Sequence, residues 1–285
     1  METKILVCCH KNDICVTGDP YLPLHVGKAL SSLDLRIQGD ETGDNISIKN
    51  ASFCELTGLY WAWKNLRGVD IVGLCHYRRY FDFHNQCKKG FPIIEIGTEQ
   101  FETIDLSVPA NYIESLQPNE IIVPKPYIGN PLLIDYCCNH ISDDFRTLCK
   151  VIRDNCGLDD YNVFKKVIMG NRIRIANMFI MRWNDFDKYC NWLFSILFEV
   201  EKRIDIASYS NYQRRVFGFM SERLLNVYIE KNHMKVRDLP IITLTDTFNY
   251  DYNQISLLRY KLRCLRHDLI AHLLIPSEEI HLSRI

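Results

Sequence analysis

The sequence predicts an α/β fold with one main domain and additional helices. Short apolar segments of the kind that form buried strands alternate with longer segments in which apolar residues recur every three or four positions. No long linker rich in glycine, serine or proline divides the chain. With 47% hydrophobic and 24% charged residues among 285, the composition is that of an ordinary globular protein, and a disordered or coiled-coil chain is excluded.

The predicted strands and helices follow one another along the chain. Short apolar runs that end at polar or proline-containing turns predict strands at residues 4–9, 69–75, 120–123 and 172–181. Apolar residues that share one helical face predict helices at residues 50–65, 132–153, 161–169, 185–204 and 211–232. Residues 83–110 have less pattern and include Gly90 and Pro92, so a long loop or a small insertion is expected there.

The chain changes character at Gln254, so we expect a main domain over residues 1–250 and a basic amphipathic helical tail over residues 251–285. In this tail, apolar residues recur at helical spacing with basic residues between them. The apolar residues are Leu257, Leu258, Leu262, Leu265, Leu269 and Ile270, and the basic residues are Arg259, Lys261, Arg263 and Arg266. Two interpretations stay open: the tail lies on a membrane surface, or it packs on the main domain with its basic residues in solvent.

Charge and targeting features exclude several classes of protein. With 34 Lys and Arg against 35 Asp and Glu, the chain lacks the positive field that draws a general nucleic-acid binder to phosphates. The N-terminal apolar run stops at His10 and Lys11, far short of the ~20 residues that span a bilayer, and no signal cleavage site follows it. We therefore expect a cytoplasmic protein. The 12 cysteines show no CxxC or Cys/His ligand spacing, so neither a disulfide framework nor a zinc site is expected.

The most unusual motif is CHYRRYF, residues 75–81, which directly follows a predicted strand. Strand alternation sends Arg78 and Arg79 to opposite faces. His76 and Tyr80 share the face of Arg78, and Tyr77 and Phe81 share the face of Arg79. A guanidinium offers a planar fork of donors to phosphate oxygens, and a tyrosine can stack on a base, so the motif predicts a phosphorylated nucleotide ligand. Arginines that pair with acidic neighbours at a strand end are the alternative explanation.

Two further groups of residues are candidates for proton transfer. Tyr136, His140 and Asp144 follow one another at intervals of four, so one continuous helix would place them on one face, where the histidine orients the carboxylate. The stretch around Asp144 is also typical of a capped, acidic helix start. Arg215 and Glu222 are seven residues apart and share a helical face, and a solvent-exposed ion pair is the simpler interpretation of this second group.

Other polar residues lie where they need partners. The predicted helix at residues 50–65 and its entry contain more polar groups than one solvent-exposed face requires, namely Asn45, Lys49, Asn50, Glu55 and Thr57. Asn177 lies inside a predicted apolar strand, where a buried amide needs hydrogen-bond partners such as sugar hydroxyls. The metal-binding pattern DxD is matched at residues 185–187, but this match is more typical of the capped first turn of a helix.

In order along the chain, a set of motifs resembles a bacterial family: KILVCCHK, YLPLHVGKAL, DETGDNISIKN, CELTGLYWAWKN, GLCHYRRYF, NMFIM with YCNWLF, and RRVFGFMSERLL. This family, once labelled only as a domain of unknown function, is encoded with capsule, exopolysaccharide and O-antigen genes. Its members are similar to glycosyltransferases, some of them galactofuranosyltransferases. The resemblance extends from Lys4 to about Pro240, and HYRRYF with ELTGLYWAWKN is its most specific part.

The resemblance implies a GT-A-like (Rossmann-like) α/β fold that binds a nucleotide-sugar donor, expected to be a uridine diphosphate sugar. It also implies a polysaccharide or lipid-linked oligosaccharide acceptor. The basic tail lies outside the resemblance, and if it lies on a membrane, the cytoplasmic protein is expected to be peripheral on the inner face of that membrane. By motif match, the donor site is expected to contain His10, Lys11, Asn45, Lys49, Asn50, Glu55, Thr57, His76, Tyr77, Arg78, Arg79, Tyr80 and Asn177. The expected catalytic residues are His140, Asp144 and Glu222.

An inverting transfer is expected, and it has two chemical needs. The leaving diphosphate gains negative charge, which Arg78, Arg79 and Lys49 are expected to neutralise in part. A Mn²⁺ or Mg²⁺ ion held by loop carboxylates stays an option. The acceptor hydroxyl loses a proton, for which Asp144 and Glu222 are the candidate bases. The alternative functions are a transferase for UDP-galactopyranose or UDP-glucose and a non-catalytic carbohydrate-binding subunit of the assembly machinery.

Overall fold

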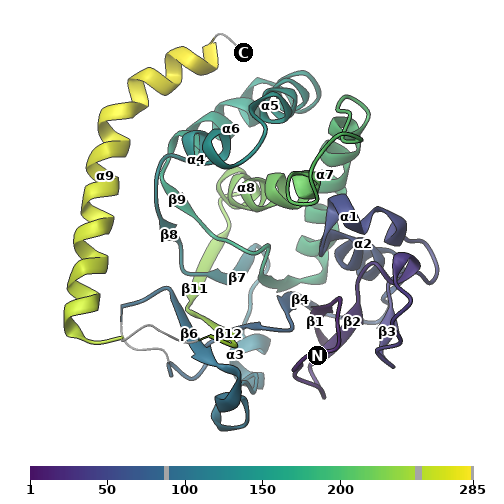
Figure 1. Ribbon diagram of the computed structural model, residues 1–285. Helices are drawn as coiled ribbons and strands as arrows, with labels where there is room; N and C mark the ends of the chain where they lie inside the picture. The colour runs from purple at the N-terminus through teal and green to yellow at the C-terminus, as the bar shows by residue number, and fades with distance from the viewer. Residues whose placement is uncertain (87–89, 248–251, 284–285) are drawn as a thin grey trace.

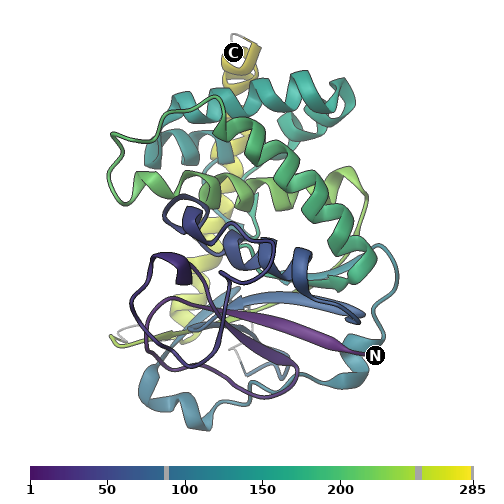
Figure 2. The same cartoon turned by 90° about the vertical axis from the view of Figure 1, so that its right-hand side faces the viewer.

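The computed structural model describes residues 1–86, 90–247 and 252–283, and it confirms the α/β class. A ten-stranded mixed sheet carries a thick layer of helices on one face (Figure 1, Figure 2). The strands of this sheet and of a small two-stranded sheet are β1 (Thr3–Cys9), β2 (Tyr21–His25), β3 (Gln38–Gly39), β4 (Ile71–His76), β5 (Arg79–Phe81), β6 (Ile93–Gly97), β7 (Glu120–Pro124), β8 (Tyr127–Ile128), β9 (Arg172–Ile173), β10 (Phe179–Arg182), β11 (Lys235–Leu239) and β12 (Ile241–Thr245). The helices are α1 (Asn50–Phe53), α2 (Leu56–Asn65), α3 (Ala110–Glu114), α4 (Leu132–Asn139), α5 (Ser142–Cys156), α6 (Leu158–Met169), α7 (Trp183–Glu201), α8 (Val216–Lys231) and α9 (Gln254–Ser283).

The order of the strands brings several chain segments to one edge of the sheet. The main path is β11-β7-β10-β4-β1-β2-β3. β1 is parallel to β2 and β4, and β2 is parallel to β3, so the carboxyl ends of these strands share an edge. β10 is antiparallel to its neighbours β4 and β7, so its first residues reach the same edge. Open α/β sheets bind ligands beyond this edge.

The side chains of β1 from Ile5 to Cys9 are buried on both faces of the sheet. Leu6 and Cys8 point into a core shared with the helical layer, whereas Ile5, Val7 and Cys9 point into a second core with β5, β6, β12 and α3. All five side chains are buried. A strand that is buried on both faces has no reason to alternate apolar and polar residues, which is why it is an unbroken apolar run in the sequence.

Three of the predicted strands are confirmed as β1, β4 and β7. The single strand predicted at residues 172–181 is wrong, because β9 and β10 belong to different sheets. Between them, Ala176 and Asn177 have left-handed backbone, with φ of 68° and 51°. Few residues other than glycine adopt this conformation, and it turns the chain out of one sheet and into the other.

The helix predicted at residues 132–153 is divided into α4 and α5. His140 lies between them with extended backbone, at φ −136° and ψ 178°. The prediction that Tyr136, His140 and Asp144 share one face of a continuous helix is therefore wrong. The helix predicted at residues 161–169 is confirmed as α6, and the one predicted at residues 185–204 as α7.

Two other predicted helices and the predicted loop need smaller corrections. The helix at residues 50–65 is interrupted at Cys54, where φ is 51°, and becomes α1 and α2. The helix at residues 211–232 is α8, preceded by a 3-10 turn at Gln213–Arg215. The predicted loop at residues 83–110 contains β6, which pairs with β12, while residues 87–89 lie outside the described part.

The tail forms α9, which runs along the outside of the molecule (Figure 1). Cys264 and Ala271 are buried against the rest of the protein, so packing on the main body, one of the two interpretations, is seen for this helix. Contact with a membrane stays a prediction. Among the described residues, no helix combines the length and the apolar character that crossing a bilayer requires.

Candidate active site

A cavity of about 640 Å³ opens at the edge of the sheet where β1, β2 and β4 end. Parts of the chain far apart in sequence meet there: the ends of these strands, α1, the turn before β10, β12 and the start of α8. The residues that line it are Cys8, His10, Val26, Asn50, Ala51, Cys54, Glu55, His76, Tyr77, Arg78, Arg79, Ala176, Asn211, Arg214, Arg215, Glu222, Thr243 and Leu244. Both arginines and glutamates are among the side chains that line this cavity.

The predicted site residues divide into two groups. Those that line the cavity are His10, Asn50, Glu55, His76, Tyr77, Arg78, Arg79 and Glu222. Those that do not line it are Lys11, Asn45, Lys49, Thr57, Tyr80, His140, Asp144 and Asn177. The structure adds Arg214 and Arg215, which the sequence interpretation did not assign to the donor site.

The CHYRRYF motif forms a tight hairpin and not one extended strand. β4 ends at His76, which pairs with Arg79 at the start of the antiparallel β5, so the predicted alternation of faces is wrong. Arg78 forms ion pairs with Asp13 at 2.9 Å and with Asp246 at 2.7 Å. Hydrogen bonds from this guanidinium hold the pKa of Asp246 below its usual range. The pairing of Arg78 with acidic neighbours, the alternative explanation of the motif, is therefore present in the structure.

Several predicted donor-site residues have structural partners away from the cavity. Lys49 donates to Glu201 at 2.6 Å, so its charge is already balanced. The hydroxyl of the buried Tyr80 donates to the carbonyl of Tyr77 at 2.8 Å and accepts from the backbone N–H of Val16 at 3.1 Å. The protein itself supplies polar partners for both side chains, so neither needs a ligand to satisfy its polar group.

Asn45, Thr57 and Lys11 are placed similarly. The Asn45 amide donates to two carbonyls of its own turn. The Thr57 hydroxyl is fully buried and accepts from Asn50 at 3.1 Å. Lys11 is exposed and forms an ion pair with Asp13 at 3.0 Å. Asn45, Thr57 and Lys11 do not line the cavity, whereas Asn50, the partner of Thr57, does.

Three arginines of the cavity have no ion pair within the described part of the chain. Arg79, Arg214 and Arg215 line the cavity, and none of them forms an ion pair with a described carboxylate. Arg215 donates to the sulfur of Cys54 at 3.4 Å, and Arg214 donates to the carbonyl of Tyr209 at 3.4 Å. The exposed ion pair between Arg215 and Glu222, which the sequence favoured, is not formed. These guanidinium groups remain available to an anion.

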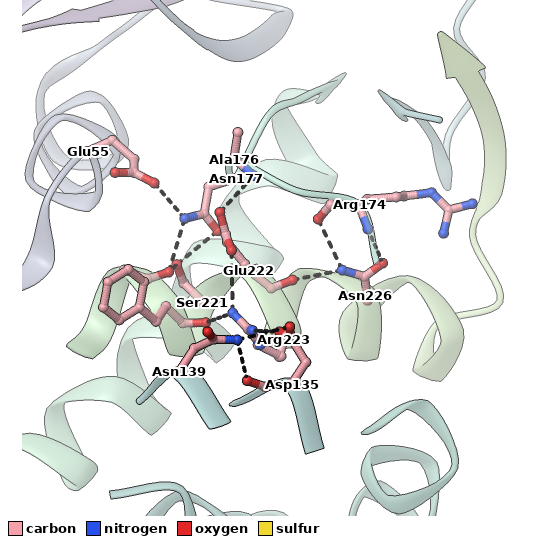
Figure 3. A network of polar contacts seen from close by, with 12 residues as sticks. Glu55, Asp135, Asn139, Arg174, Ala176, Asn177, Ser221, Glu222, Arg223 and Asn226 are labelled. Atoms are coloured by element: carbon pink, nitrogen blue, oxygen red, sulfur yellow. Dashed lines mark hydrogen bonds and ion pairs between the residues drawn. The ribbon is translucent and has the colours of Figure 1, made fainter. Parts of the chain in front are cut away.

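The left-handed turn before β10 positions two carboxylates (Figure 3). The backbone N–H of Ala176 donates to Glu222 at 2.8 Å, and the side-chain amide of Asn177 donates to Glu55 at 2.6 Å. The Ser221 hydroxyl donates to the Asn177 carbonyl oxygen at 2.8 Å, which fixes the amide's orientation. Asn177 therefore finds the partners that a buried amide needs, and they belong to the protein.

α8 holds this turn in place from the other side. The Asn226 side chain accepts from the backbone N–H of Arg174 at 3.0 Å and donates to the carbonyl of the same residue at 3.2 Å (Figure 3). The carbonyl of Ala176 accepts from His76 at 2.7 Å. Because burial lowers the pKa of His76, the neutral ring is favoured there. Hydrogen bonds therefore connect this turn to α8, to β4 and to both glutamates of the cavity.

Glu222 has the electrostatic character of a base. Burial raises the pKa of its carboxyl group above the ordinary value, although 24% of the side chain stays exposed and the carboxylate lines the cavity. Arg223 lies 3.4 Å from the second carboxylate oxygen and opposes this shift. A carboxylate with a raised pKa takes a proton more readily than an ordinary one.

His140 and Asp144 contact the chain segment that carries Arg214 and Arg215. The Tyr209 hydroxyl donates to the buried Asp144 at 2.7 Å. The His140 ring stacks on Tyr212, with centroids 5.8 Å apart, and on Phe219 at 3.9 Å. Burial lowers the pKa of His140 to about 4, so the ring is neutral near pH 7. Both residues contact the 209–215 segment, and neither lines the cavity.

The described residues contain no group of three or more His, Cys, Asp or Glu side chains arranged to hold a metal ion. The DxD match lies at the start of α7, so the acidic helix start is confirmed, but the helix begins at Trp183 and has no side-chain cap. Asp185 accepts from the backbone N–H of Asn119 at 2.9 Å, and Asp187 accepts from the indole of Trp63 at 2.7 Å. Both carboxylates have structural partners, so the DxD match does not fit a metal site.

Substitutions of Asn177 test whether this residue has the left-handed backbone conformation, which costs free energy for residues other than glycine. Asn177→Gly and Asn177→Ala both remove the hydrogen bonds to Glu55 and Ser221, which is expected to cost about 1–3 kcal/mol of unfolding free energy. Alanine must also adopt the left-handed backbone, so Asn177→Ala is expected to be about 1 kcal/mol less stable than Asn177→Gly. Urea unfolding measures both. Equal stability of the two variants would contradict a left-handed turn.

Comparison with solved structures agrees with the fold described above. The chain is similar to the apo structure of WbbM, a bifunctional glycosyltransferase, with 30% sequence identity and a TM-score of 0.77 over 90% of this chain. The match covers 48% of WbbM, so this chain spans about half the length of that protein. The fold is therefore the expected GT-A-like fold with additional C-terminal helices.

A comparison with curated proteins gave no significant match. A family model, described as "Domain of unknown function (DUF4422)", matches residues 4–233, in close agreement with the extent of the motifs found in the sequence. Because this match covers well over half of the 285 residues, the chain belongs to the DUF4422 family.

Proposed function

We propose that the protein is a glycosyltransferase that moves a galactofuranosyl group from UDP-galactofuranose to a saccharide or lipid-linked oligosaccharide in surface polysaccharide synthesis. One observation supports this most: a single cavity at the carboxyl edge of the sheet holds three arginines that pair with no described carboxylate, together with two oriented glutamates. The first group suits the diphosphate of a sugar donor, and the second suits hydroxyl groups. The similarity to WbbM, a glycosyltransferase, supports the same reaction class.

The diphosphate is assigned to Arg79, Arg214 and Arg215. As the bond between the sugar and the diphosphate breaks, negative charge grows on the leaving oxygen, and guanidinium groups already in place stabilise it. This assignment replaces Lys49, which is paired with Glu201. Arg78, paired on both sides with carboxylates, holds the hairpin in shape. Tyr77, which has the His10 ring edge-on at 5.3 Å, is the proposed wall for the base.

Glu222 is assigned as the base of an inverting transfer. The acceptor oxygen attacks the anomeric carbon, its proton passes to the Glu222 carboxylate, and the electron pair of the breaking bond leaves with the nucleoside diphosphate. The raised pKa of Glu222 suits it to this step. Glu55, fixed by Asn177, is assigned to sugar hydroxyls. Asp144, the other candidate, is engaged by Tyr209 outside the cavity.

A panel of nucleotide sugars tests the proposal directly. Hydrolysis and transfer are measured for UDP-galactofuranose, UDP-galactopyranose, UDP-glucose and a guanosine diphosphate sugar, each with manganese and with a chelator. The fastest turnover is expected with UDP-galactofuranose. Preference for another UDP-sugar would keep the reaction class and change the donor, because a few pocket side chains set that choice. Carbohydrate binding without turnover of any donor would instead indicate the non-catalytic subunit.

Tyr209→Phe is expected to raise the donor KM about tenfold with a smaller change in kcat. Loss of its hydroxyl leaves the buried Asp144 without this partner and loosens the segment that carries Arg214 and Arg215, at a cost of about 1–3 kcal/mol. Steady-state kinetics measures the two constants. Tyr161→Phe is the matched control, because that half-buried ring has no hydroxyl contact among the described residues. An unchanged donor KM would show that the contact does not position the arginines.

A further inference from the structure

One face of α9 packs on the protein and the opposite face does not. On the inner face, the rings of Tyr260 and Phe91 lie 5.5 Å apart, and Asp268 accepts from Asn171 at 2.8 Å. Asp268 also pairs with Arg172 at 3.2 Å. These contacts fix the rotation of the helix about its own axis, and they therefore determine which residues face outward.

The outward face carries a continuous apolar stripe. Its residues recur every three or four positions, so they lie in one line along the helix. They are Ile255, Leu258, Leu262, Leu265, Leu269 and Leu273, with 56% to 74% of each side chain's surface exposed. These six make up half of the twelve large apolar side chains that are exposed in the described part of the protein. Single exposed leucines are common on protein surfaces, but a line of six is not.

Basic residues flank this stripe on both sides. With about 100° of rotation per residue, Arg259 and Arg266 lie along one side of it and Lys261 along the other. All three are exposed, and none forms an ion pair with a described carboxylate. The only acidic residue between positions 254 and 273 is Asp268, which faces the protein. Over residues 254–273, the outward face therefore combines apolar and cationic groups and carries no acidic side chain.

We propose that this outward face of α9, the stripe with its basic flanks, docks on an anionic membrane surface. Leucine side chains enter the boundary between head groups and acyl chains, while arginine and lysine reach the phosphates around them. A second copy of the helix fits less well, because pairing two stripes would bring basic flanks against basic flanks, and residues 254–273 offer no outward carboxylate to place between them. This proposal does not depend on the proposed sugar transfer.

Vesicle binding by the full chain tests this proposal. Sedimentation with phosphatidylcholine vesicles is compared with sedimentation with vesicles that also contain phosphatidylglycerol. Binding is expected only to the anionic vesicles and is expected to weaken as salt is added. The double variant Leu262→Glu with Leu269→Glu is expected to bind at least about tenfold more weakly. Leu158→Glu, at an exposed leucine on α6, is the matched control and is expected to bind like the unmodified protein.

A second double variant distinguishes loss of the docking face from loss of folding. Arg259→Gln with Arg266→Gln keeps the apolar stripe and is expected to lose the preference for anionic vesicles, whereas Arg67→Gln, at an exposed arginine far from α9, is expected to keep it. Thermal unfolding confirms that each variant folds. No binding to anionic vesicles at low salt would overturn the proposal. So would a dimer, seen by light scattering, that the leucine variant converts to a monomer.

Discussion

Glu222→Gln is expected to lower the rate of sugar transfer by about 10²–10⁴-fold, the usual contribution of a general base. Glutamine keeps the size of the side chain, and its carbonyl oxygen still accepts from the Ala176 N–H, so the geometry of the turn is kept. The proton acceptor is lost. Because Glu222 is not assigned to the diphosphate, the affinity for the donor, measured by calorimetry, is expected to change little.

Asp144→Asn is the matched comparison. The amide oxygen still accepts from the Tyr209 hydroxyl, and the side chain does not line the cavity, so turnover is expected to stay close to that of the unmodified protein. Full turnover in both variants would show that neither carboxylate is the base. A large loss only in Asp144→Asn would reverse the assignment.

The pH profile gives a second readout of the same assignment. The carboxylate form of Glu222 is the active form, so kcat/KM rises with pH through the pKa of this group. Burial raises that pKa, which places the midpoint above the ordinary range of a glutamate. In Glu222→Gln this limb of the profile is expected to disappear. A limb that stays unchanged in the variant would identify another titrating group.

The sequence predicted those strands whose own residues have a clear strand pattern. It missed strands whose conformation depends on pairing with a neighbour. β1, β4 and β7 are apolar runs buried on both faces, and such runs are recognisable without knowing their neighbours. β2 contains Pro23, and β11 mixes charged with apolar residues, so neither has a clear strand pattern. Their strand conformation depends on the partners that pair with them, β1 and β7, which the sequence does not show.

The candidate site shows the same limit at the level of side chains. The CHYRRYF motif was singled out from its composition, but only the fold shows that it forms a hairpin and that Arg78 is neutralised by residues 65 and 168 positions away. Similarly, residues 172–181 are apolar enough for one strand, and the break at Asn177 is stabilised by α8, more than 40 residues later. The signal for Arg214 and Arg215 was present as two basic residues directly before a helix that contains a glutamate.

Arg215→Gln is expected to lower kcat/KM for the donor by about 10²–10³-fold, as loss of one preorganised group that stabilises transition-state charge does. The guanidinium lines the cavity beside Cys54 and has no described carboxylate to pair with, so its removal leaves the diphosphate charge less balanced. Arg215→Lys keeps the charge and loses the planar fork of donors, and an intermediate loss is expected. Arg79→Gln is expected to resemble Arg215→Gln.

Two controls separate this effect from a general loss of positive charge. Arg146→Gln removes an exposed guanidinium on α5, far from the cavity wall, and is expected to leave the affinity for UDP unchanged. Lys49→Gln removes a cation that the sequence assigned to the diphosphate and the structure pairs with Glu201, so it is expected to reduce stability more than UDP affinity. If Lys49→Gln weakened UDP binding as much as Arg215→Gln, the salt bridge would have to open to receive the donor, and the diphosphate would lie nearer α1 than proposed.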